Sequence, residues 1–489
     1  MPTRRKRTPS RSRAPAIVWF RDDLRLADNP ALHAARKHGG PVVPIFIWAP
    51  EEEGAWRSGA ASRWWLHQSL ARLGAELRDA GATLVIRRGP VLSQLLAVAK
   101  AAEARAIVWN RRYEPAVVLR DRKVKESLCA AGYLAEELSA SLLHEPATIR
   151  NKSGKPFQVF TPFWKACLLA PEPQQPLPTI RKLTPQPKPL PSLSLAELEL
   201  EPKINWATGL CAAWIPGSAG AHAELKRFLK RGFSNYSEDR NRPDLPGTSR
   251  LSPHLHFGEI SPREVWHATR TFAESASSSS GWRTCQFLTE LGWREFAHHL
   301  LFHFPHTAEQ PLRSEFARFP WRQDANLLRA WQRGRTGYPF VDAGMRQLWT
   351  TGWMHNRVRM VVASFLVKNL LLPWQAGARW FWDTLVDADL ANNTLGWQWT
   401  AGCGADAAPY FRIFNPISQG EKFDPEGEYV RRWVPELARL PGKWIQKPWQ
   451  APASTLAAAG VELGRTYPKP LVSLSISREV ALEAYRKIR

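Results

Sequence analysis

The run AIVWF at residues 16–20 is the first of four short apolar runs, rich in β-branched residues, near the start of the chain. The others are VVPIFIW (42–48), TLVI (83–86) and AIVW (106–109). Runs of this length without polar alternation are typical of strands buried on both faces, as in a parallel sheet. The sequence therefore predicts an α/β domain in which helices cover a parallel sheet and right-handed crossovers connect its strands.

Helical patterns lie between these runs, and one of them predicts an amphipathic helix that opens at Ser62 and ends at Gly81. No G-x-G-x-x-G follows the first predicted strand, so a Rossmann dinucleotide site is not indicated. Nine prolines between residues 171 and 206 indicate a semi-extended interdomain connector, and helical periodicity follows it. We predict a basic disordered tail at 1–14, an α/β domain at 15–145, a linker at 146–219 and an all-α domain at 220–489.

The chain of 489 residues has a formal net charge of +23, and without the six basic residues of its first 13 positions the charge is still +17. This surplus favours a polyanionic partner such as nucleic acid, although a generic basic surface that keeps a protein soluble gives the same number. The five cysteines are scattered and lack C-x-x-C spacing, which favours reduced thiols. The sequence contains no run of 18 or more uncharged apolar residues, so no membrane span is predicted. We expect a cytoplasmic monomer, associated with the nucleoid if the source is bacterial.

Three stretches of the helical half contain polar residues that amphipathic packing does not explain. In GTSRLSPHLHFGEISPR (247–263), hydroxyls before a predicted helix start suit a phosphate group, and an ordinary capped loop would look the same. In TGWMHNRVRM (351–360), Asn356 and Met360 share a helix face where a planar ligand could be gripped, or where arginines are merely solvated. In the third stretch, Asp387 and Asp389 precede an aromatic run, and because buried carboxylates are costly unless paired, Arg359 is a plausible partner for them.

Together these stretches resemble the photolyase/cryptochrome flavoproteins. The resemblance extends from VWFRDDLRLADNP (18–30) to about Tyr467 and rests on TSRLS, TGYPxVDAxMRQL, TGWMHNRxRM and DAAPYFRIFNPxxQGEKFD in this order. It implies a U-shaped FAD held without a covalent bond in the helical domain. The motif DADLxxNTLGWQW (387–399) is similar to that of the bacterial branch called class III, which is close to plant cryptochromes.

The resemblance assigns FAD contacts residue by residue. Arg359 and Asp387 match an ion pair beside the isoalloxazine ring, and Asp389 matches another ring contact. Asn393 matches the residue that faces flavin N5, and a neutral amide there is typical of photolyases because it cannot readily deliver a proton. Phe287 stands where several relatives have tryptophan. The implied FAD contacts are Tyr236, Thr248, Ser249, Arg250, Leu251, Ser252, Phe287, Trp353, Asn356, Arg359, Asp387, Asp389 and Asn393.

The resemblance also implies a substrate, the cyclobutane pyrimidine dimer in DNA. Asn356 and Met360 stand where (6-4) photolyases have two functional histidines, which argues against (6-4) repair. The implied contacts are Glu290 at a pyrimidine carbonyl, Trp293 and Trp399 stacked on the two sides of the dimer, Met360 beside it, and Arg294 and Arg357 on DNA phosphates.

The implied activity is that of a deoxyribodipyrimidine photolyase, a light-driven carbon–carbon lyase. Such an enzyme flips the dimer into a pocket over the flavin, and excited reduced FAD donates an electron that opens the dimer and then returns. Glu290 and Asn356 are the implied catalytic residues at the dimer. Trp397, Trp374 and Trp321 match a relay that carries electrons from the surface to oxidised flavin.

An antenna chromophore at the α/β domain is a further implication. The class III branch implies 5,10-methenyltetrahydrofolate, with a deazaflavin as the alternative. The implied contacts lie in WNRRYEP and are Asn110, Arg111 and Glu114.

Other classes of protein compete with this hypothesis. A cryptochrome-type photoreceptor without repair activity would share the FAD, but Asn393, Trp293 and Trp399 favour an enzyme. A DNA-binding protein without catalysis would explain the charge and leave the flavin motifs unused. His299 and His303 have a spacing that suits zinc, but no acid or cysteine accompanies them, so no metal site is predicted.

Overall fold

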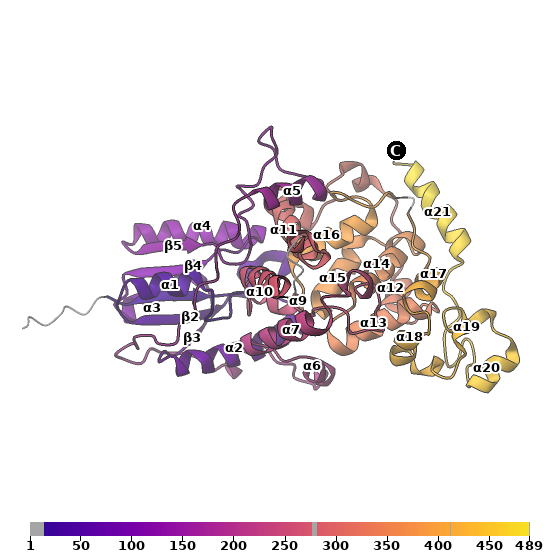
Figure 1. Ribbon diagram of the computed structural model, residues 1–489, viewed down its shortest axis with the longest axis horizontal. Coiled ribbons are helices and arrows are strands. Elements are labelled where there is room, and N and C mark those ends of the chain that lie inside the picture. The colour runs from indigo at the N-terminus through magenta and orange to yellow at the C-terminus, as the bar shows by residue number, and fades with distance from the viewer. Residues whose placement is uncertain (1–13, 276–280, 411, 489) are drawn as a thin grey trace, which may run out of the picture.

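The computed structural model describes residues 14–275, 281–410 and 412–488. Most of the predicted basic tail, residues 1–13, lies outside this part of the chain. The strands gather at one end of the molecule and the later helices form the rest (Figure 1). Among the described residues, none of the helices is both long and apolar enough to cross a lipid bilayer.

The N-terminal part is built on a five-stranded parallel sheet with the strand order β3-β2-β1-β4-β5. Each of the four predicted apolar runs becomes a strand, and the strand β1 in the middle pairs with β2 and β4. The fifth strand, at the edge, was not predicted because its sequence LAEEL is neither apolar throughout nor alternating. The strands are β1 (Ala16–Phe20), β2 (Val42–Trp48), β3 (Val85–Arg88), β4 (Ala106–Asn110) and β5 (Leu134–Leu138).

Four α-helices accompany the sheet: α1 (Pro30–Lys37), α2 (Ala60–Asp79), α3 (Val91–Ala101) and α4 (Pro115–Ala130). Helix α2 begins at Ala60, two residues before the predicted start, because the Ser62 hydroxyl donates to the Leu385 carbonyl instead of capping the helix. The Ala60 amide donates to Asp383 Oδ1 at 2.9 Å. A Cβ at Gly59 would overlap the backbone of Trp382 and Asp383. The start of α2 is therefore fitted directly against the helical part of the chain.

The predicted linker contains two helices, α5 (Phe160–Leu169) and α6 (Thr208–Ala213), which pack against α11 and α13 of the helical part. The proline-rich stretch between α5 and α6 is irregular apart from one turn of 3-10 helix at Ala196–Leu198. Its backbone bonds to the α/β domain, as the Leu183 amide does to the Ala80 carbonyl. The linker is thus a strap along the first domain with a helix near each end.

The helical part is arranged around α16, which packs against α11, α14 and α15. The predicted fold class, α/β followed by all-α, is confirmed. Its helices are α7 (Ser218–Arg231), α8 (Tyr236–Asp239), α9 (Ser252–His256), α10 (Pro262–Ser275), α11 (Gln286–His303), α12 (Ala325–Gln332), α13 (Pro339–Thr351), α14 (Asn356–Ser364), α15 (Trp374–Thr384), α16 (Leu390–Ala401), α17 (Pro416–Phe423), α18 (Glu428–Trp433), α19 (Gly442–Ile445), α20 (Ala453–Ala459) and α21 (Leu474–Arg486), with a π-helical segment at Phe365–Asn369 after α14.

Candidate functional site

Helix α16 has one partly exposed face although it lies at the centre of the helical part. Asp389 caps its N-terminus by accepting from the Asn392 amide, and Gly402 ends it with a φ of 87°. Asn393, Gly396 and Trp399 are three residues apart and therefore lie on one side of the helix, which we call the open face. A Cβ at Gly396 would meet no heavy atom within 4 Å. A helix otherwise surrounded by packing partners thus borders open space.

An ion pair lies just before α16. Arg359 Nη2 donates to both carboxylate oxygens of Asp387, at 2.8 and 3.1 Å, and Arg359 Nε donates to the Met354 carbonyl at 2.7 Å. The Asp387 side chain is only 2% exposed, so the guanidinium compensates a carboxylate removed from water. Of the two carboxylates for which Arg359 was a plausible partner, Asp387 is the one that it pairs with.

The hydroxyl-bearing segment 248–252 meets this ion pair through Trp353. Trp353 Nε1 donates to Ser252 Oγ at 3.3 Å, and the Arg359 guanidinium lies 5.9 Å from the Trp353 ring centroid. Arg250, with a φ of 55°, lies 5.7 Å from the same ring. Arg250 Nε is buried without a hydrogen-bond partner among the described residues. Hydroxyls together with a guanidinium N–H that has no acceptor suit the pyrophosphate of a dinucleotide.

Two aromatic rings belong to the same hydrophobic cluster as Leu251 of this segment. Tyr236 and Phe287 pack edge to face with ring centroids 5.6 Å apart. On the open face, Asn393 Nδ2 donates to the Ala378 carbonyl at 3.0 Å, and Asn393 remains partly exposed. The donor set therefore fits FAD: hydroxyls and Arg250 for the phosphates, and the Arg359–Asp387 pair with Asn393 for the flavin ring.

Asp389, the other flavin-ring contact that the resemblance implies, lies at the start of α16 beside two histidines. Its Oδ1 accepts from the Asn392 amide at 2.8 Å, and its Oδ2 lies 3.3 Å from His298 Nε2 and 3.9 Å from His256 Nδ1. Burial opposes ionisation, but the two histidines outweigh it and hold the pKa of Asp389 well below its usual range. The structure thus shows Asp389 as a largely covered carboxylate at the start of α16, stabilised as the anion by two histidines.

The implied dimer-binding carboxylate is held by two residues that sequence reasoning missed. Glu290 Oε1 lies 2.6 Å from Arg240 Nη2 and accepts from Gln286 Nε2 at 2.7 Å. Nearby, Arg357 Nη2 donates to Asn241 Oδ1 at 2.6 Å. Arg240 and Asn241 follow the short helix α8 and have no distinctive pattern in the sequence, so only the fold reveals that they meet Glu290 and Arg357.

The implied aromatic contacts of the dimer are partly exposed. Trp293 stacks on Phe160 with ring centroids 3.8 Å apart and an interplanar angle of 8°, which leaves its other face uncovered by that ring. Asn356 is exposed at the first position of α14, and Met360 lies one turn later, partly buried.

Arg294 does not join this group. Its Nη1 donates to the Ser141 carbonyl at 2.7 Å, and its side chain is 11% exposed. Because Arg294 is one residue after Trp293, it lies about 100° further around α11 and faces the segment that follows β5. The phosphate contact that the resemblance implies would use the remaining N–H groups of this guanidinium.

The three implied relay tryptophans lie in or against one hydrophobic cluster. Trp397 and Trp374 are buried, and Trp321 is partly exposed, which is the order expected for a path from the interior to the surface. Trp397 packs against Phe381 with ring centroids 5.0 Å apart, and a Cβ at Gly377 would overlap the Trp397 ring. The indole of Trp397 is therefore fixed by close packing.

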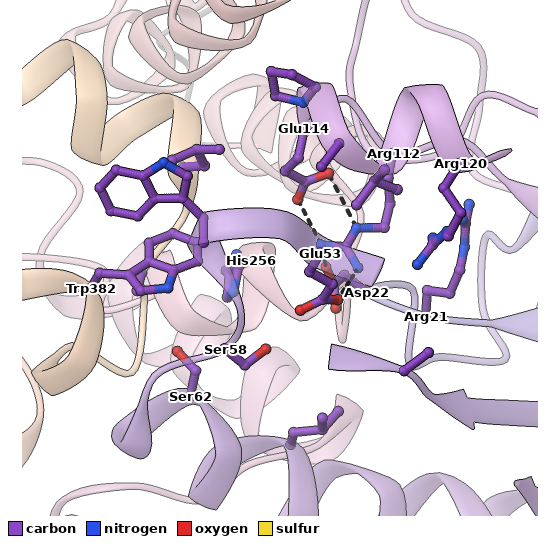
Figure 2. A pocket seen from close by; sticks show the side chains of 18 of the residues that line it. Arg21, Asp22, Glu53, Ser58, Ser62, Arg112, Glu114, Arg120, His256 and Trp382 are labelled. Atoms are coloured by element: carbon purple, nitrogen blue, oxygen red, sulfur yellow. Dashed lines mark hydrogen bonds and ion pairs between the residues drawn. The ribbon is translucent and has the colours of Figure 1, made fainter. Parts of the chain in front are cut away.

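A second site is a cavity of about 220 Å³ between the α/β and helical parts (Figure 2). Arg112 lies at its wall, 3.1 Å from Asp22, 3.3 Å from Glu53 and 2.9 Å from Glu114. Burial alone would raise the pKa of Glu114, but Arg112 lowers it to about 2, whereas burial raises the pKa of Glu53. The cavity thus offers acceptor oxygens in two different electrostatic states.

Tryptophans from both parts complete this cavity. Trp56 and Trp382 lie edge to face with ring centroids 5.3 Å apart, and both line it. Of the implied antenna residues, only Glu114 lines it. Asn110 is buried and donates to Asp23 and Asn29, and Arg111 pairs with Glu137 and Glu145. Arg112 and Glu114 both belong to the motif WNRRYEP, so part of the segment singled out in the sequence lines this cavity.

The environment of His355 predicts a loss of folding stability at acidic pH. It is buried, its Nδ1 accepts from the Arg357 amide at the start of α14, and burial together with neighbouring arginines lowers its pKa to about 3. An unfolded histidine titrates near pH 6.5, so protonation of the unfolded chain costs stability progressively as the pH falls from about 6.5 towards 3. His355→Asn keeps a capping acceptor without this titration. Its melting temperature should fall less than that of the wild type between pH 7 and 4; parallel losses would contradict this role for His355.

Comparison with known proteins places this geometry in a family. Residues 16–184 match the family described as DNA photolyase, and residues 287–487 match the FAD binding domain of DNA photolyase. The deoxyribodipyrimidine photo-lyase of Agrobacterium fabrum is 50% identical, over 97% of this chain and 98% of its own length. Cryptochrome-1 of Arabidopsis thaliana is 44% identical, over 96% of this chain and 70% of its own length.

The same relationship holds in three dimensions. The crystal structure of a bacterial class III photolyase from Agrobacterium tumefaciens matches with a TM-score of 0.94 and 48% identity, over 99% of both chains. A cryptochrome from Synechocystis matches with a TM-score of 0.88 and 30% identity, over 98% of this chain. With both domains matched and both chains covered, this chain belongs to the photolyase/cryptochrome family.

Proposed function

We propose that the protein repairs cyclobutane pyrimidine dimers in DNA when illuminated. The observation that carries this proposal is the neutral amide of Asn393 on the open face of α16, close in sequence to the Arg359–Asp387 pair, in a chain that also holds Glu290 beside Arg240. Reduced FAD, when bound, supplies the electron that opens the dimer on illumination. The side chains of this protein bind and orient the dimer and the flavin.

The Glu290–Arg240 pair matches the edge of a pyrimidine base. A thymine ring presents an N–H donor between two carbonyl acceptors, so a carboxylate can accept from the N–H while a guanidinium donates to a carbonyl. Gln286 Nε2 is the second donor to Glu290 Oε1 and restricts the orientation of this carboxylate. The pair is thus assembled before the substrate arrives, which reduces the cost of ordering it on binding.

Trp293 provides a stacking surface for the dimer. Because Phe160 supports one face of its indole, the other face is presented to a ligand in a fixed orientation. A dimer flipped out of the duplex would lose base stacking and regain part of it on this indole. The basic surplus of the chain supplies attraction for the DNA backbone.

Repair of a defined substrate tests this function. Protein loaded with reduced FAD should remove dimers from an oligonucleotide under blue light and leave them intact in the dark. Protein that binds dimer-containing DNA but leaves it unrepaired in the light would instead support a photoreceptor, the alternative suggested by the 44% identity to Cryptochrome-1. Undamaged DNA of the same sequence is the control for binding.

We further propose that the interdomain cavity holds the antenna chromophore, with 5,10-methenyltetrahydrofolate preferred over a deazaflavin. The support is chemical: Glu53 and Glu114 present acceptor oxygens to the amino and ring N–H groups of a pterin, and Trp56 and Trp382 flank the space with aromatic surface. A folate band near the ultraviolet edge and a deazaflavin band further into the blue distinguish the two chromophores.

Replacing Glu114 should deplete this chromophore selectively. In Glu114→Gln the ionised acceptor is lost from the cavity, so we expect less of the second chromophore to copurify while the FAD content is unchanged. Glu137→Gln is a matched control, because Glu137 pairs with Arg111 outside the cavity lining. Absorbance spectra of the two purified variants measure both chromophores. Equal retention of the second chromophore in both would argue against this cavity as its site.

A further inference from the structure

The loop at residues 150–156, with the sequence RNKSGKP, is a basic projection that none of the contacts above uses. It leads into α5 and stands out beyond the body of the molecule above α5 in Figure 1. Lys152, Ser153, Gly154 and Lys155 are all exposed. The surrounding segment 146–170 contains four basic residues and no acid. The loop therefore presents positive charge that has no carboxylate within its own segment.

The loop has a defined shape. Asn151 Oδ1 accepts from the amides of Ser153 and Lys155 at 3.0 and 2.9 Å, and the Asn151 amide donates to the Lys155 carbonyl at 2.9 Å. Gly154 adopts a φ of 74°, a left-handed conformation that glycine accepts without strain. Arg150 Nη1 donates to the Gly154 carbonyl at 3.0 Å. The backbone that carries the two lysines is thus fixed before any partner binds.

The base of the loop is attached to α11, the helix that carries Glu290 and Trp293. The Phe157 amide donates to His299 Nε2 at 3.1 Å, and His303 Nε2 lies 3.0 Å from the Pro146 carbonyl. Burial lowers the pKa of His299 to about 4, so at neutral pH it is the uncharged acceptor that this bond needs. The two histidines whose spacing suits zinc are therefore hydrogen-bonded to the two ends of this segment.

The chain that follows the loop leads to Phe160, which supports the proposed stacking surface of Trp293. Gln158 and Val159 are exposed and connect it to Phe160, whose ring stacks on Trp293. Two lysines are therefore held on a rigid arm a few residues from the proposed stacking surface. A DNA duplex seated there with its dimer flipped out would bring backbone phosphates past this arm.

We propose that the 150–156 loop is a DNA-binding element, in which Lys152 and Lys155 contact backbone phosphates flanking the dimer. This inference rests on the proposed repair function and adds an interaction surface to it. The contact is with phosphate and is independent of base sequence. Its contribution is therefore electrostatic and depends on salt.

The test is the salt dependence of binding to a dimer-containing duplex. The double variant Lys152→Ala/Lys155→Ala should bind more weakly than the wild type. The slope of log affinity against log salt should become shallower by about 2, because each lost lysine–phosphate contact removes about 0.9 from the slope. The matched control is Lys123→Ala/Lys125→Ala, which removes the same charge from the exposed side of α4 in the α/β domain. FAD content equal to that of the wild type shows that both variants are folded.

The outcomes separate the two proposals. A loop variant with the wild-type slope, or with a slope change no larger than that of the α4 control, overturns the loop inference while repair can still be intact. A wild-type protein that shows no preference for dimer-containing over undamaged duplex instead contradicts the proposed function. Lys152→Glu/Lys155→Glu should enlarge the loss of affinity in the same direction; unchanged binding by this charge reversal also overturns the inference.

Discussion

Trp397→Phe is expected to reduce light-driven reduction of oxidised FAD by at least about ten-fold. Trp397 is buried in the cluster that also contains Trp374, and phenylalanine in its place has no indole that could give up an electron. An added barrier of about 1.4 kcal/mol already slows a step ten-fold, and loss of the first donor of the relay should exceed that. The measurement is the loss of flavin absorbance under blue light in the presence of an external reductant.

The same variant should keep its repair activity when its flavin is reduced chemically beforehand, since the relay is then not needed. Trp399→Phe is the matched control, because Trp399 is two residues away on α16 but lies on the open face. It should be photoreduced at the wild-type rate. Normal photoreduction of Trp397→Phe would show that electrons reach the flavin by another path.

Arg359→Ala is expected to lower both the stability of the helical part and its FAD content. The substitution leaves the Asp387 carboxylate, 2% exposed, without its guanidinium. Removing one partner of a buried pair typically costs about 3–5 kcal/mol, because the remaining charge is neither hydrated nor paired. Denaturant unfolding measures the stability, and the ratio of flavin to protein absorbance measures the FAD content.

A double variant separates the two effects. Arg359→Met with Asp387→Asn removes both charges, so stability should largely recover while FAD content stays low, because the contacts to the flavin ring are still missing. Arg357→Ala, on the same helix but bonded to Asn241, should leave FAD content unchanged. Wild-type stability and FAD content in Arg359→Ala would show that this pair does not hold the flavin.

The sequence predicted the sheet where hydrophobic pattern alone determines burial. The runs at β1, β2 and β4 are apolar because these strands lie inside the sheet, whereas the run TLVI overlaps only the buried first half of the edge strand β3. Strand β5 was not predicted from the hydrophobic pattern, because an edge strand that pairs on one side tolerates acidic residues such as the two in LAEEL. The start of α2 was misplaced by two residues because a serine hydroxyl was assumed to cap it, whereas Ser62 bonds to the other domain.

The site was predictable where an energetic necessity links two residues. A buried carboxylate at Asp387 or Asp389 requires a cation, and Arg359 was a plausible one, so a pair with one of the two could be expected before the fold was known. No such energetic argument links Glu290 to Arg240 in the sequence. The two residues are 50 positions apart and meet only because α8 packs against α11. Asn110 is polar and lies in a motif, and both N–H groups of its side chain donate to neighbours inside the α/β domain, which the sequence alone does not reveal.

The interdomain cavity has walls from two separately packed regions, with Glu114 on one side and Trp382 on the other. A molecule bound there touches both and can be bound fully only when they are docked. By mass action, its binding free energy therefore adds to the free energy that holds the domains together. The chromophore proposed for this cavity is therefore expected to stabilise the contact between the two parts as well as to collect light, and the protein without it is expected to be cleaved more readily by proteases.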